Sequence, residues 1–194
     1  MDIRLEHISK KFDQKDVLAD ISMTFTEGRI SCIMGASGSG KTTLINILMG
    51  IIKPDSGELK GVSDKKIAAV FQEDRLIEHW NALKNVLLVC DRNISENLVN
   101  THLNEVGLTG YENKTVKQLS GGMRRRVALV RAMLADSDLL ILDEPFKGLD
   151  ESLRQQVIQY VIRHSTNKTV IVVTHDREDA VLLGAELHIL EKAL

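Results

Sequence analysis

Hydrophobic residues change their spacing several times along this chain, and each spacing predicts a different kind of element. Near the N-terminus they alternate with polar residues, at Ile3 and Leu5 and again at Ile21, Met23 and Phe25, as in half-buried strands. Farther along they form short unbroken runs, which are typical of strands buried on both faces of a parallel sheet. The runs cover residues 30–34, 67–71, 139–142, 169–173 and 186–190.

Segments with helical spacing separate these buried runs. The expected helices cover residues 43–49, 121–135, 152–163 and 177–183. Strands that alternate with helices in this way indicate an α/β fold with a mainly parallel sheet.

Residues 74–118 differ from the rest because they contain no buried-strand run. One apolar stripe passes through Leu83, Val86, Leu87 and Val89, which indicates a mainly helical segment. We therefore expect a single domain over residues 1–194. Its core would consist of residues 1–73 and 121–194, and residues 74–120 would form a helical subdomain.

The composition is that of an ordinary globular protein. Apolar residues make up 43% and charged residues 27%, and a net charge of −2 gives no basic field that would attract nucleic acid. No apolar run approaches the roughly 18 residues that cross a bilayer, and the first residues do not form a signal peptide. Cys32 and Cys90 do not make a disulfide framework, and Cys32 is expected in the core. We expect a cytoplasmic protein that would need other chains to span a membrane.

Residues 35–42 read Gly-Ala-Ser-Gly-Ser-Gly-Lys-Thr and fit the pattern G-x-x-x-x-G-K-[ST]. The context supports the match because an apolar strand precedes it and a helical segment follows it. Glycines let backbone N–H groups surround phosphate oxygens, and the helix N-terminus adds partial positive charge. In this pattern Lys41 reaches the β- and γ-phosphates, and the hydroxyl of Thr42 holds Mg²⁺. The segment therefore predicts an ATP site.

Two further motifs fit the same chemistry. Ser120 precedes Gly121 and Gly122 at the start of a predicted helix, where it would cap the helix and leave the glycine N–H groups open to an anion. Asp143 and Glu144 follow an apolar strand at the sheet edge where ligands of α/β proteins bind. A carboxylate at that edge can hold Mg²⁺. Because adjacent carboxylates in apolar surroundings repel, the pKa of one of them is expected to be raised.

In this order, the phosphate loop, the Leu-Ser-Gly-Gly-Met loop and the apolar strand ending in two carboxylates resemble the motifs of the ABC-type ATPase family. The resemblance covers essentially the whole chain. It implies an α/β fold with a P-loop NTPase (RecA-like) core, a mainly parallel sheet, an N-terminal antiparallel β subdomain and a helical subdomain insert. It also implies that the protein binds ATP and Mg²⁺ and hydrolyses ATP.

The resemblance further assigns roles to single residues. It makes Glu144 the general base for the attacking water, Gln72 a contact of Mg²⁺ and water, His175 a hydrogen-bond partner of the γ-phosphate, and Asp150 part of a loop that communicates across a dimer. The implied catalytic residues are Glu144, His175, Gln72 and Lys41, and the implied metal ligands are Thr42, Gln72 and Asp143. The implied ATP-binding residues are Phe12, Gly35, Ser37, Gly38, Ser39, Gly40, Lys41, Thr42, Thr43, Ser120, Gly121, Gly122 and Asp150.

The second anion site, at residues 120–122, bears on the oligomeric state. One nucleotide has no need of two helix N-termini from opposite subdomains of one chain. The simplest account is a head-to-tail dimer, in which residues 120–122 of one subunit close on the ATP held by Lys41 of the other. The family resemblance implies the same arrangement.

Several positions leave alternatives open. Phe12 lies where the family places an aromatic ring against adenine, but a core position is equally expected. Trp80 lies in a stretch that resembles nitrate, sulfonate and taurine importers, where it borders the permease-binding groove; packing within the helical subdomain is the alternative. Met123 replaces the glutamine of most family members, which removes one side-chain hydrogen bond. Residues 124–126, all arginine, are expected to form a solvated helix face that supports the anion site rather than a nucleic-acid patch.

We interpret the chain as the ATP-hydrolysing subunit of an ABC transporter that imports a small solute. The expected partners are integral-membrane permease subunits, a second ATPase subunit and, indirectly, an extracytoplasmic solute-binding protein, with no nucleic acid. The expected location is the inner face of the cell membrane. One alternative is a soluble ABC-type mechanochemical ATPase acting on nucleic acid or ribosomes. Another is an ATP-binding adaptor without turnover, against which the presence of Lys41, Glu144 and His175 argues.

Overall fold

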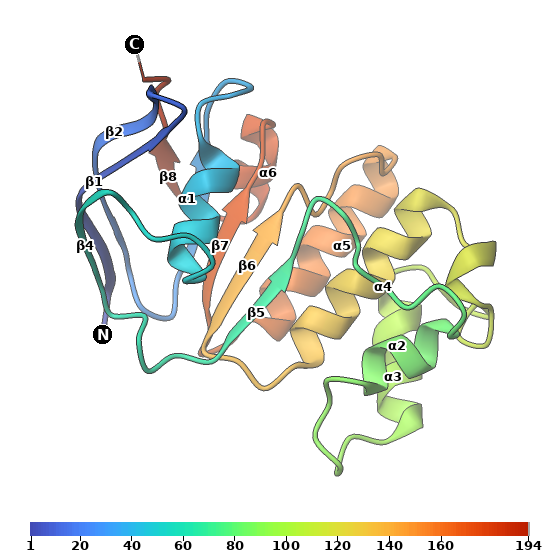
Figure 1. Cartoon of the computed structure of the whole chain (residues 1–194). Helices are drawn as coiled ribbons and strands as arrows, with labels where there is room; N and C mark the ends of the chain where they lie inside the picture. Colours follow the sequence, from blue (N-terminus) through green and yellow to red (C-terminus); the bar gives the residue numbers. More distant parts are fainter. Residues whose placement is uncertain (194) are drawn as a thin grey trace.

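A computed structural model describes residues 1–193 and shows two β-sheets in that range (Figure 1). The larger sheet has the strand order β5-β6-β7-β3-β8, and all of its neighbouring strands are parallel. This confirms the parallel α/β core that the apolar runs predict. Its strands are β3 (Ile30–Met34), β5 (Ile67–Val70), β6 (Leu139–Asp143), β7 (Thr169–Val173) and β8 (Glu186–Ile189).

The smaller sheet is antiparallel, with the order β2-β1-β4, and forms the expected N-terminal β subdomain. It contains β1 (Ile3–Phe12), β2 (Lys15–Phe25) and β4 (Ser56–Lys60). Asp13 and Gln14 join β1 to β2, and both have positive φ angles, of 46° and 65°. Two consecutive residues of this kind are typical of a two-residue hairpin turn whose twist matches that of the flanking strands.

Four helices pack against the larger sheet, and each begins and ends within about two residues of its expected boundaries. Helix α1 (Lys41–Leu48) follows the phosphate loop, and the others that pack on the core are α4 (Gly121–Leu134), α5 (Glu151–His164) and α6 (Arg177–Leu182). Within residues 1–193, none of the helices combines the length and the apolar content needed to cross a bilayer.

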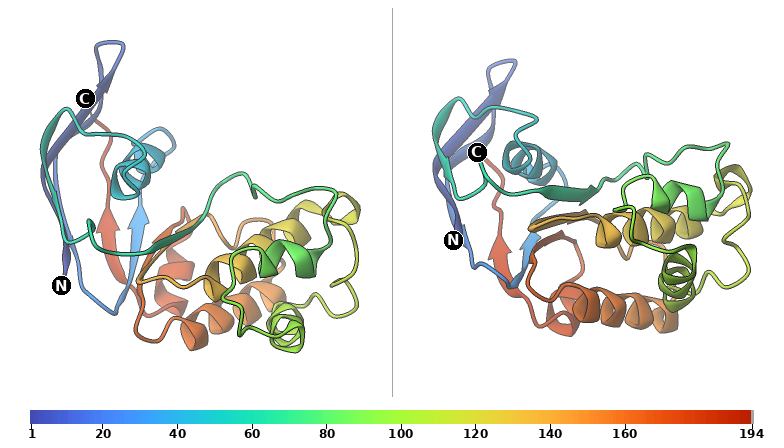
Figure 2. Two further views of the ribbon diagram at one scale, coloured as in Figure 1. Left: turned by 60° about the horizontal axis from the view of Figure 1, so that its bottom comes forward. Right: turned by 90° about the horizontal axis from the view of Figure 1, so that it is seen from below.

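The segment between β5 and α4 lies at the opposite end of the molecule from the antiparallel sheet (Figures 1 and 2). It holds α2 (Ala82–Leu87), α3 (Glu96–Glu105) and a short 3₁₀ helix (Val116–Gln118), joined by loops and turns. These helices agree with the expected helical subdomain, although loops and turns make up much of its length. Because α2 ends at Leu87, Val89 leaves the apolar stripe and is exposed.

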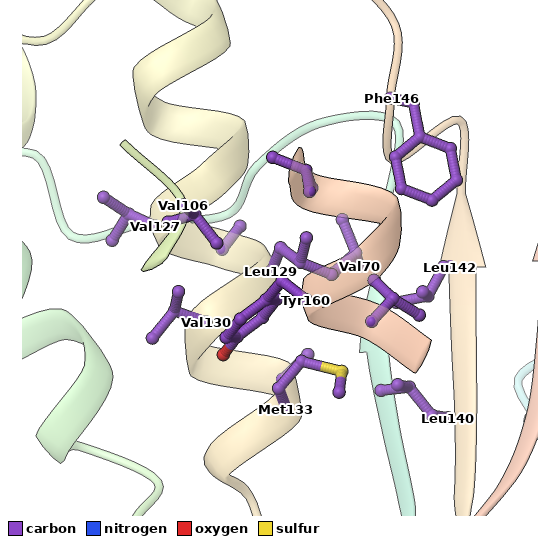
Figure 3. Packing of buried hydrophobic residues seen from close by; sticks show 14 of the residues in the cluster. Val70, Val106, Val127, Leu129, Val130, Met133, Leu140, Leu142, Phe146 and Tyr160 are labelled. Carbon is purple, nitrogen blue, oxygen red and sulfur yellow. The ribbon is translucent and has the colours of Figure 1, made fainter. Parts of the chain in front are cut away.

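Successive residues of the central strands point into two hydrophobic cores, one on each face of the larger sheet. Leu140 and Leu142 of β6 join the core formed with α4 and α5, whereas Leu139 and Ile141 join the core formed with α1 and the smaller sheet. Because side chains alternate along a strand, only a continuous apolar run can fill both cores. Figure 3 shows the first core, where Leu140, Leu142 and Val70 gather with side chains of α4 and α5.

Leu142→Ala is expected to lower the free energy of unfolding by about 2–5 kcal/mol, because a fully buried side chain would leave a cavity. Val181→Ala is the control, since Val181 on α6 is 73% exposed. It should change the free energy of unfolding by less than about 0.5 kcal/mol. Urea unfolding of both variants makes the comparison, and an equally small effect at Leu142 would contradict the burial of β6 between two cores.

Candidate functional site

The phosphate loop connects the end of β3 to the start of α1 and is packed too tightly for side chains at two of its glycines. A Cβ on Gly35 would lie 2.4 Å from the carbonyl oxygen of Leu190, and a Cβ on Gly40 would lie 2.7 Å from that of Val17. Gly40 also has a φ of 93°, a conformation that L-residues with side chains rarely adopt. These constraints explain why the loop needs glycine at both positions.

Lys41 lies in the curve of this loop. Its ammonium group donates to the carbonyl oxygens of Gly35 at 2.8 Å and Ala36 at 2.9 Å. Ser37 and Gly38 are exposed at the tip of the loop, as expected of residues that meet a ligand. Ser39 differs from them, because its side chain is fully buried and its hydroxyl has no hydrogen-bond partner.

The three predicted metal ligands meet in one pocket. Thr42, Gln72 and Asp143 all line a hollow of about 230 Å³, together with Phe71 and Arg75. They come from the start of α1, the loop after β5 and the last residue of β6. A hydroxyl, an amide carbonyl and a carboxylate supply the oxygen donors that Mg²⁺ prefers, so the residues present fit this ion.

Burial raises the pKa of the Asp143 carboxyl above its ordinary value, and the neighbouring Glu144 carboxylate raises it further. Arg125, Lys41 and Lys147 act in the opposite direction. The expectation that one member of the acidic pair has a raised pKa is therefore confirmed for Asp143.

Glu144 and His175 form the second part of the site. Nδ1 of His175 lies 2.8 Å from Oε2 and 3.0 Å from Oε1 of Glu144, and both residues line a hollow of about 240 Å³. The backbone of Glu144 has a φ of 50°, and its N–H donates to the carbonyl of Val173 at 2.9 Å. The structure thus brings together the two residues that the resemblance assigns to water activation and γ-phosphate sensing.

A cluster of charged residues next to His175 was not predicted from the sequence. Arg154 of α5 is buried, and its guanidinium contacts Asp179 at 2.7 Å and Asp176 at 2.9 Å. The hydroxyl of Thr174 donates to the other oxygen of Asp179. Because Thr174 and Asp176 flank His175, the cluster ties the histidine loop to α5. Alternating acidic and basic residues on neighbouring helices would have been the only signal in the sequence, and such patterns usually mark solvated faces.

The predicted cap at Ser120 is present, and Asp150 caps α5 in the same way. Ser120 Oγ accepts a hydrogen bond from the backbone N–H of Met123 at 3.3 Å, and Asp150 Oδ1 accepts one from Leu153 at 3.0 Å. Gly121 is exposed at the start of α4. Residues 120–122 and Asp150 line neither of the two hollows described above. Within one chain, the structure therefore does not bring them into the hollow of Thr42, Gln72 and Asp143 or into that of Glu144 and His175.

The three arginines that follow this loop do not form a solvated face, so that expectation was wrong. Arg126 is 8% exposed and donates to the carbonyls of Val106 at 2.7 Å and Gly107 at 3.0 Å. Arg125 is also largely covered and reaches the carbonyls of Gln72 and Glu144. The reason is that α4 lies between the helical segment and the sheet, where arginine can satisfy backbone carbonyls of both.

The alternatives at the two aromatic positions are resolved in part. Phe12 is 44% exposed at the β1–β2 turn, with the ammonium of Lys10 5.5 Å from the ring centre, so the core alternative is wrong. Trp80 is 39% exposed just before α2. Its backbone carbonyl accepts a hydrogen bond from Val116, which ties this stretch to the 3₁₀ helix.

Comparison with known proteins is consistent with this geometry. Residues 18–147 match the family described as "ABC transporter". The chain belongs to the ABC transporter family. It is 38% identical to the spermidine/putrescine import ATP-binding protein PotA of Spiroplasma citri over 94% of this chain and 57% of that protein. It is 35% identical to the taurine import ATP-binding protein TauB of Pseudomonas fluorescens strain Pf0-1 over 97% of this chain and 77% of that protein.

A solved ABC cassette has the same fold. The dimeric structure of MJ0796 in a post-hydrolysis state, bound to ADP and Pi, has a TM-score of 0.85 and 29% identity over 99% of this chain and 97% of that chain. As a member of this ABC transporter family, the protein binds and hydrolyses ATP. The resemblance to taurine-type importers is also confirmed at the level of sequence similarity.

Asp143→Asn is expected to raise the midpoint of thermal unfolding at pH 7 while strongly reducing ATP hydrolysis. The pKa of this carboxyl is higher in the folded than in the unfolded chain, so stability is lost as the pH rises through the folded-state pKa. Asparagine cannot ionise, so the variant does not lose this stability. The difference in unfolding midpoint between the variant and the wild type should narrow as the pH falls toward 3.8, the ordinary pKa of the carboxyl, because Asp143 then becomes protonated in the folded and the unfolded chain alike. Calorimetry across this range makes the test, and an asparagine variant less stable than the wild type at pH 7 would contradict it.

Proposed function

We propose that this chain is the ATP-hydrolysing subunit of a transporter that imports a small solute. The observation that carries the proposal is that Thr42, Gln72 and Asp143 line one pocket. The Glu144–His175 pair lies just beyond the ends of β6 and β7. The relatives named above are import ATP-binding proteins, which favours import over export. Solute selectivity would then belong to other chains.

In the proposed mechanism, the phosphate loop and Lys41 hold the β- and γ-phosphates. Thr42, Gln72 and Asp143 would hold Mg²⁺, which supplies neutralisation of phosphate charge when bound. Glu144 accepts a proton from the water that attacks the γ-phosphorus, and ADP leaves as the bond to its β-phosphate oxygen breaks. Most of the rate enhancement in such a reaction comes from positioning and charge stabilisation.

His175 has a second role in this proposal. Its ring nitrogen lies within hydrogen-bonding distance of both Glu144 carboxylate oxygens, so it fixes the direction of the base. The Arg154–Asp179 pair in turn fixes the loop that carries His175, because Asp179 accepts a hydrogen bond from Thr174. A base that is held in place loses less entropy when the water and phosphate come together.

We further propose that two copies form a head-to-tail dimer around ATP. Residues 120–122 line neither the hollow of Thr42, Gln72 and Asp143 nor the hollow of Glu144 and His175, so they are free to meet the nucleotide of another subunit. The N-terminus of α4, a helix of 14 residues, offers exposed glycine N–H groups to the phosphates. The dimeric state of the solved cassette supports the same arrangement.

The proposed membrane partner is a permease that contacts the segment between β5 and α4. Large apolar side chains are exposed there, including Ile77, Trp80 and Leu88. Such residues, gathered on one segment, are typical of protein contacts. The protein would then lie on the cytoplasmic side of the membrane, and a solute-binding protein would act on the opposite side.

Affinity purification tests the proposed function. Tagged Glu144→Gln protein, prepared with Mg-ATP from native membranes in mild detergent, should retain a multi-span permease, because ATP binding persists when proton transfer is blocked. Trp80→Ala is the matched variant and should lower the permease recovery without changing ATP affinity. Recovery of ribosomes or nucleic acid without a permease would instead indicate a soluble mechanochemical ATPase.

Glu144→Gln should also form a stable dimer in Mg-ATP, since the sandwich cannot reopen through hydrolysis. Adding Ser120→Arg should return the protein to a monomer while leaving nucleotide affinity within about threefold, because a bulky cation would replace the cap at the trans anion site. Light scattering and a fluorescent ATP analogue measure the two properties. A double variant that still dimerises would show that residues 120–122 do not contact the partner's nucleotide.

A further inference from the structure

The guanidinium of Arg125 joins three segments that ATP hydrolysis needs in fixed positions. Arg125 lies in the second turn of α4, and its side chain is 12% exposed. Its Nη1 donates to the backbone carbonyl of Glu144 at 2.8 Å, and its Nη2 donates to the backbone carbonyl of Gln72. Its Nε lies 3.4 Å from Oδ1 of Asp74.

We propose that Arg125 is a positioning residue for ATP hydrolysis. It holds the peptides of Gln72 and Glu144 in place from the helix that begins with residues 120–122. The inference rests on the roles proposed above for Gln72 and Glu144, and it adds a residue that acts through them rather than on the nucleotide.

The backbone of Glu144 needs such support. Its φ of 50° lies in the left-handed region, which residues with a side chain rarely adopt. Three hydrogen bonds hold the backbone of this residue. Its N–H donates to the carbonyl of Val173 at 2.9 Å, and its carbonyl accepts from Arg125 at 2.8 Å and from the N–H of Lys147 at 3.3 Å. Because the backbone direction sets the direction of the side chain, these bonds help to aim the carboxylate toward His175.

The loop after β5 depends on α4 in the same way. Residues 71–75 belong to no helix or strand, and arginines from α4 hold three of their carbonyls. Arg125 holds Gln72, whereas Arg131 holds Asp74 at 3.0 Å and Arg75 at 2.8 Å. Arg131 therefore anchors the loop without touching Gln72 or Glu144, which makes it a close match for a control.

The contacts of Arg125 require the shape of its side chain as well as its charge. A guanidinium is planar and carries five N–H donors, so one group can reach two carbonyls and a carboxylate together. Asp74 is largely buried beside it, so its carboxylate faces the guanidinium with little competing water. A lysine would keep the charge but could not bridge the two carbonyls with the same geometry.

The location of Arg125 also links the two halves of a dimeric site. Gly121 and Arg125 are four residues apart on one helix, a separation of about 6 Å along its axis. A shift of α4 that follows engagement of the partner's nucleotide by Gly121 would therefore move the carbonyl contacts of Gln72 and Glu144. Arg125 would in this way let closure on one nucleotide adjust the catalytic groups at the other.

The test compares Arg125→Gln, Arg125→Lys and Arg131→Gln in steady-state ATP hydrolysis, nucleotide binding and thermal unfolding. Both Arg125 variants should lower kcat by about 10- to 100-fold, as expected when a reacting group shifts by about 1 Å. Their affinity for a fluorescent ATP analogue should stay within about threefold of the wild type. Arg131→Gln should lower the unfolding midpoint at least as much as Arg125→Gln, yet keep kcat within about threefold.

A double variant shows whether Arg125 acts through Glu144. If it does, adding Arg125→Gln to Glu144→Gln should change the residual hydrolysis rate by less than about threefold, because the group being positioned is already disabled. A loss that multiplies the two single effects would overturn the inference that Arg125 acts through Glu144. So would full activity in Arg125→Lys, or equal kcat losses in Arg125→Gln and Arg131→Gln.

The proposed function and this inference fail in different ways. If Glu144→Gln alone keeps wild-type activity, the role of Glu144 is wrong and the inference falls with it. If Glu144→Gln is inactive but Arg125→Gln hydrolyses ATP at the wild-type rate, the proposed site stands and only the positioning role of Arg125 is overturned.

Discussion

The site depends on the register of the parallel sheet. Val173 of β7 pairs with Ile33 of β3 on one side and with Asp143 of β6 on the other, and Val70 of β5 pairs with Leu142 of β6. The carboxyl ends of these four strands therefore lie level at one edge. The phosphate loop, the histidine loop, the acidic pair and Gln72 each follow one of these ends, so aligned strands place residues that are distant in sequence into two neighbouring hollows.

Register in turn depends on the two cores. A shift of one residue along β6 would exchange Leu140 and Leu142 for Leu139 and Ile141 in the core under α4 and α5. Ile141 differs in shape from the leucine that it would replace, and the packing on both faces would change at once. The helices and the antiparallel sheet thus hold the strands in register from opposite sides, and the catalytic geometry is a consequence of that packing.

The sequence predicts the strands, the main helices and the motif residues well because each leaves a local signal. Apolar runs mark β3, β6 and β7, and glycines mark loops that no other residue fits. The burial of Arg125, Arg126 and Arg154 could not be predicted, because their partners are backbone carbonyls and carboxylates from segments up to 53 residues away in sequence. A hydrogen bond between residues distant in sequence leaves no periodic pattern, and a run of arginines usually indicates a solvated surface. The predicted apolar stripe extends past the end of α2 to Val89 for a related reason, since apolar residues in a loop resemble a continuing helix.

The exposed ring of Phe12, next to the β1–β2 turn, would influence the choice of nucleotide in the base-stacking role that the family resemblance implies. A phenylalanine side chain has no hydrogen-bond donor or acceptor, so it can offer a base only a flat aromatic face. Every purine and pyrimidine presents a matching face, and stacking of this kind tolerates a change of base. Discrimination would then fall on the triphosphate, for which the phosphate loop and Lys41 supply directional hydrogen-bond donors. Such a site would distinguish the number of phosphates better than the identity of the base, and the relative cellular concentrations of nucleotides would decide which one is hydrolysed.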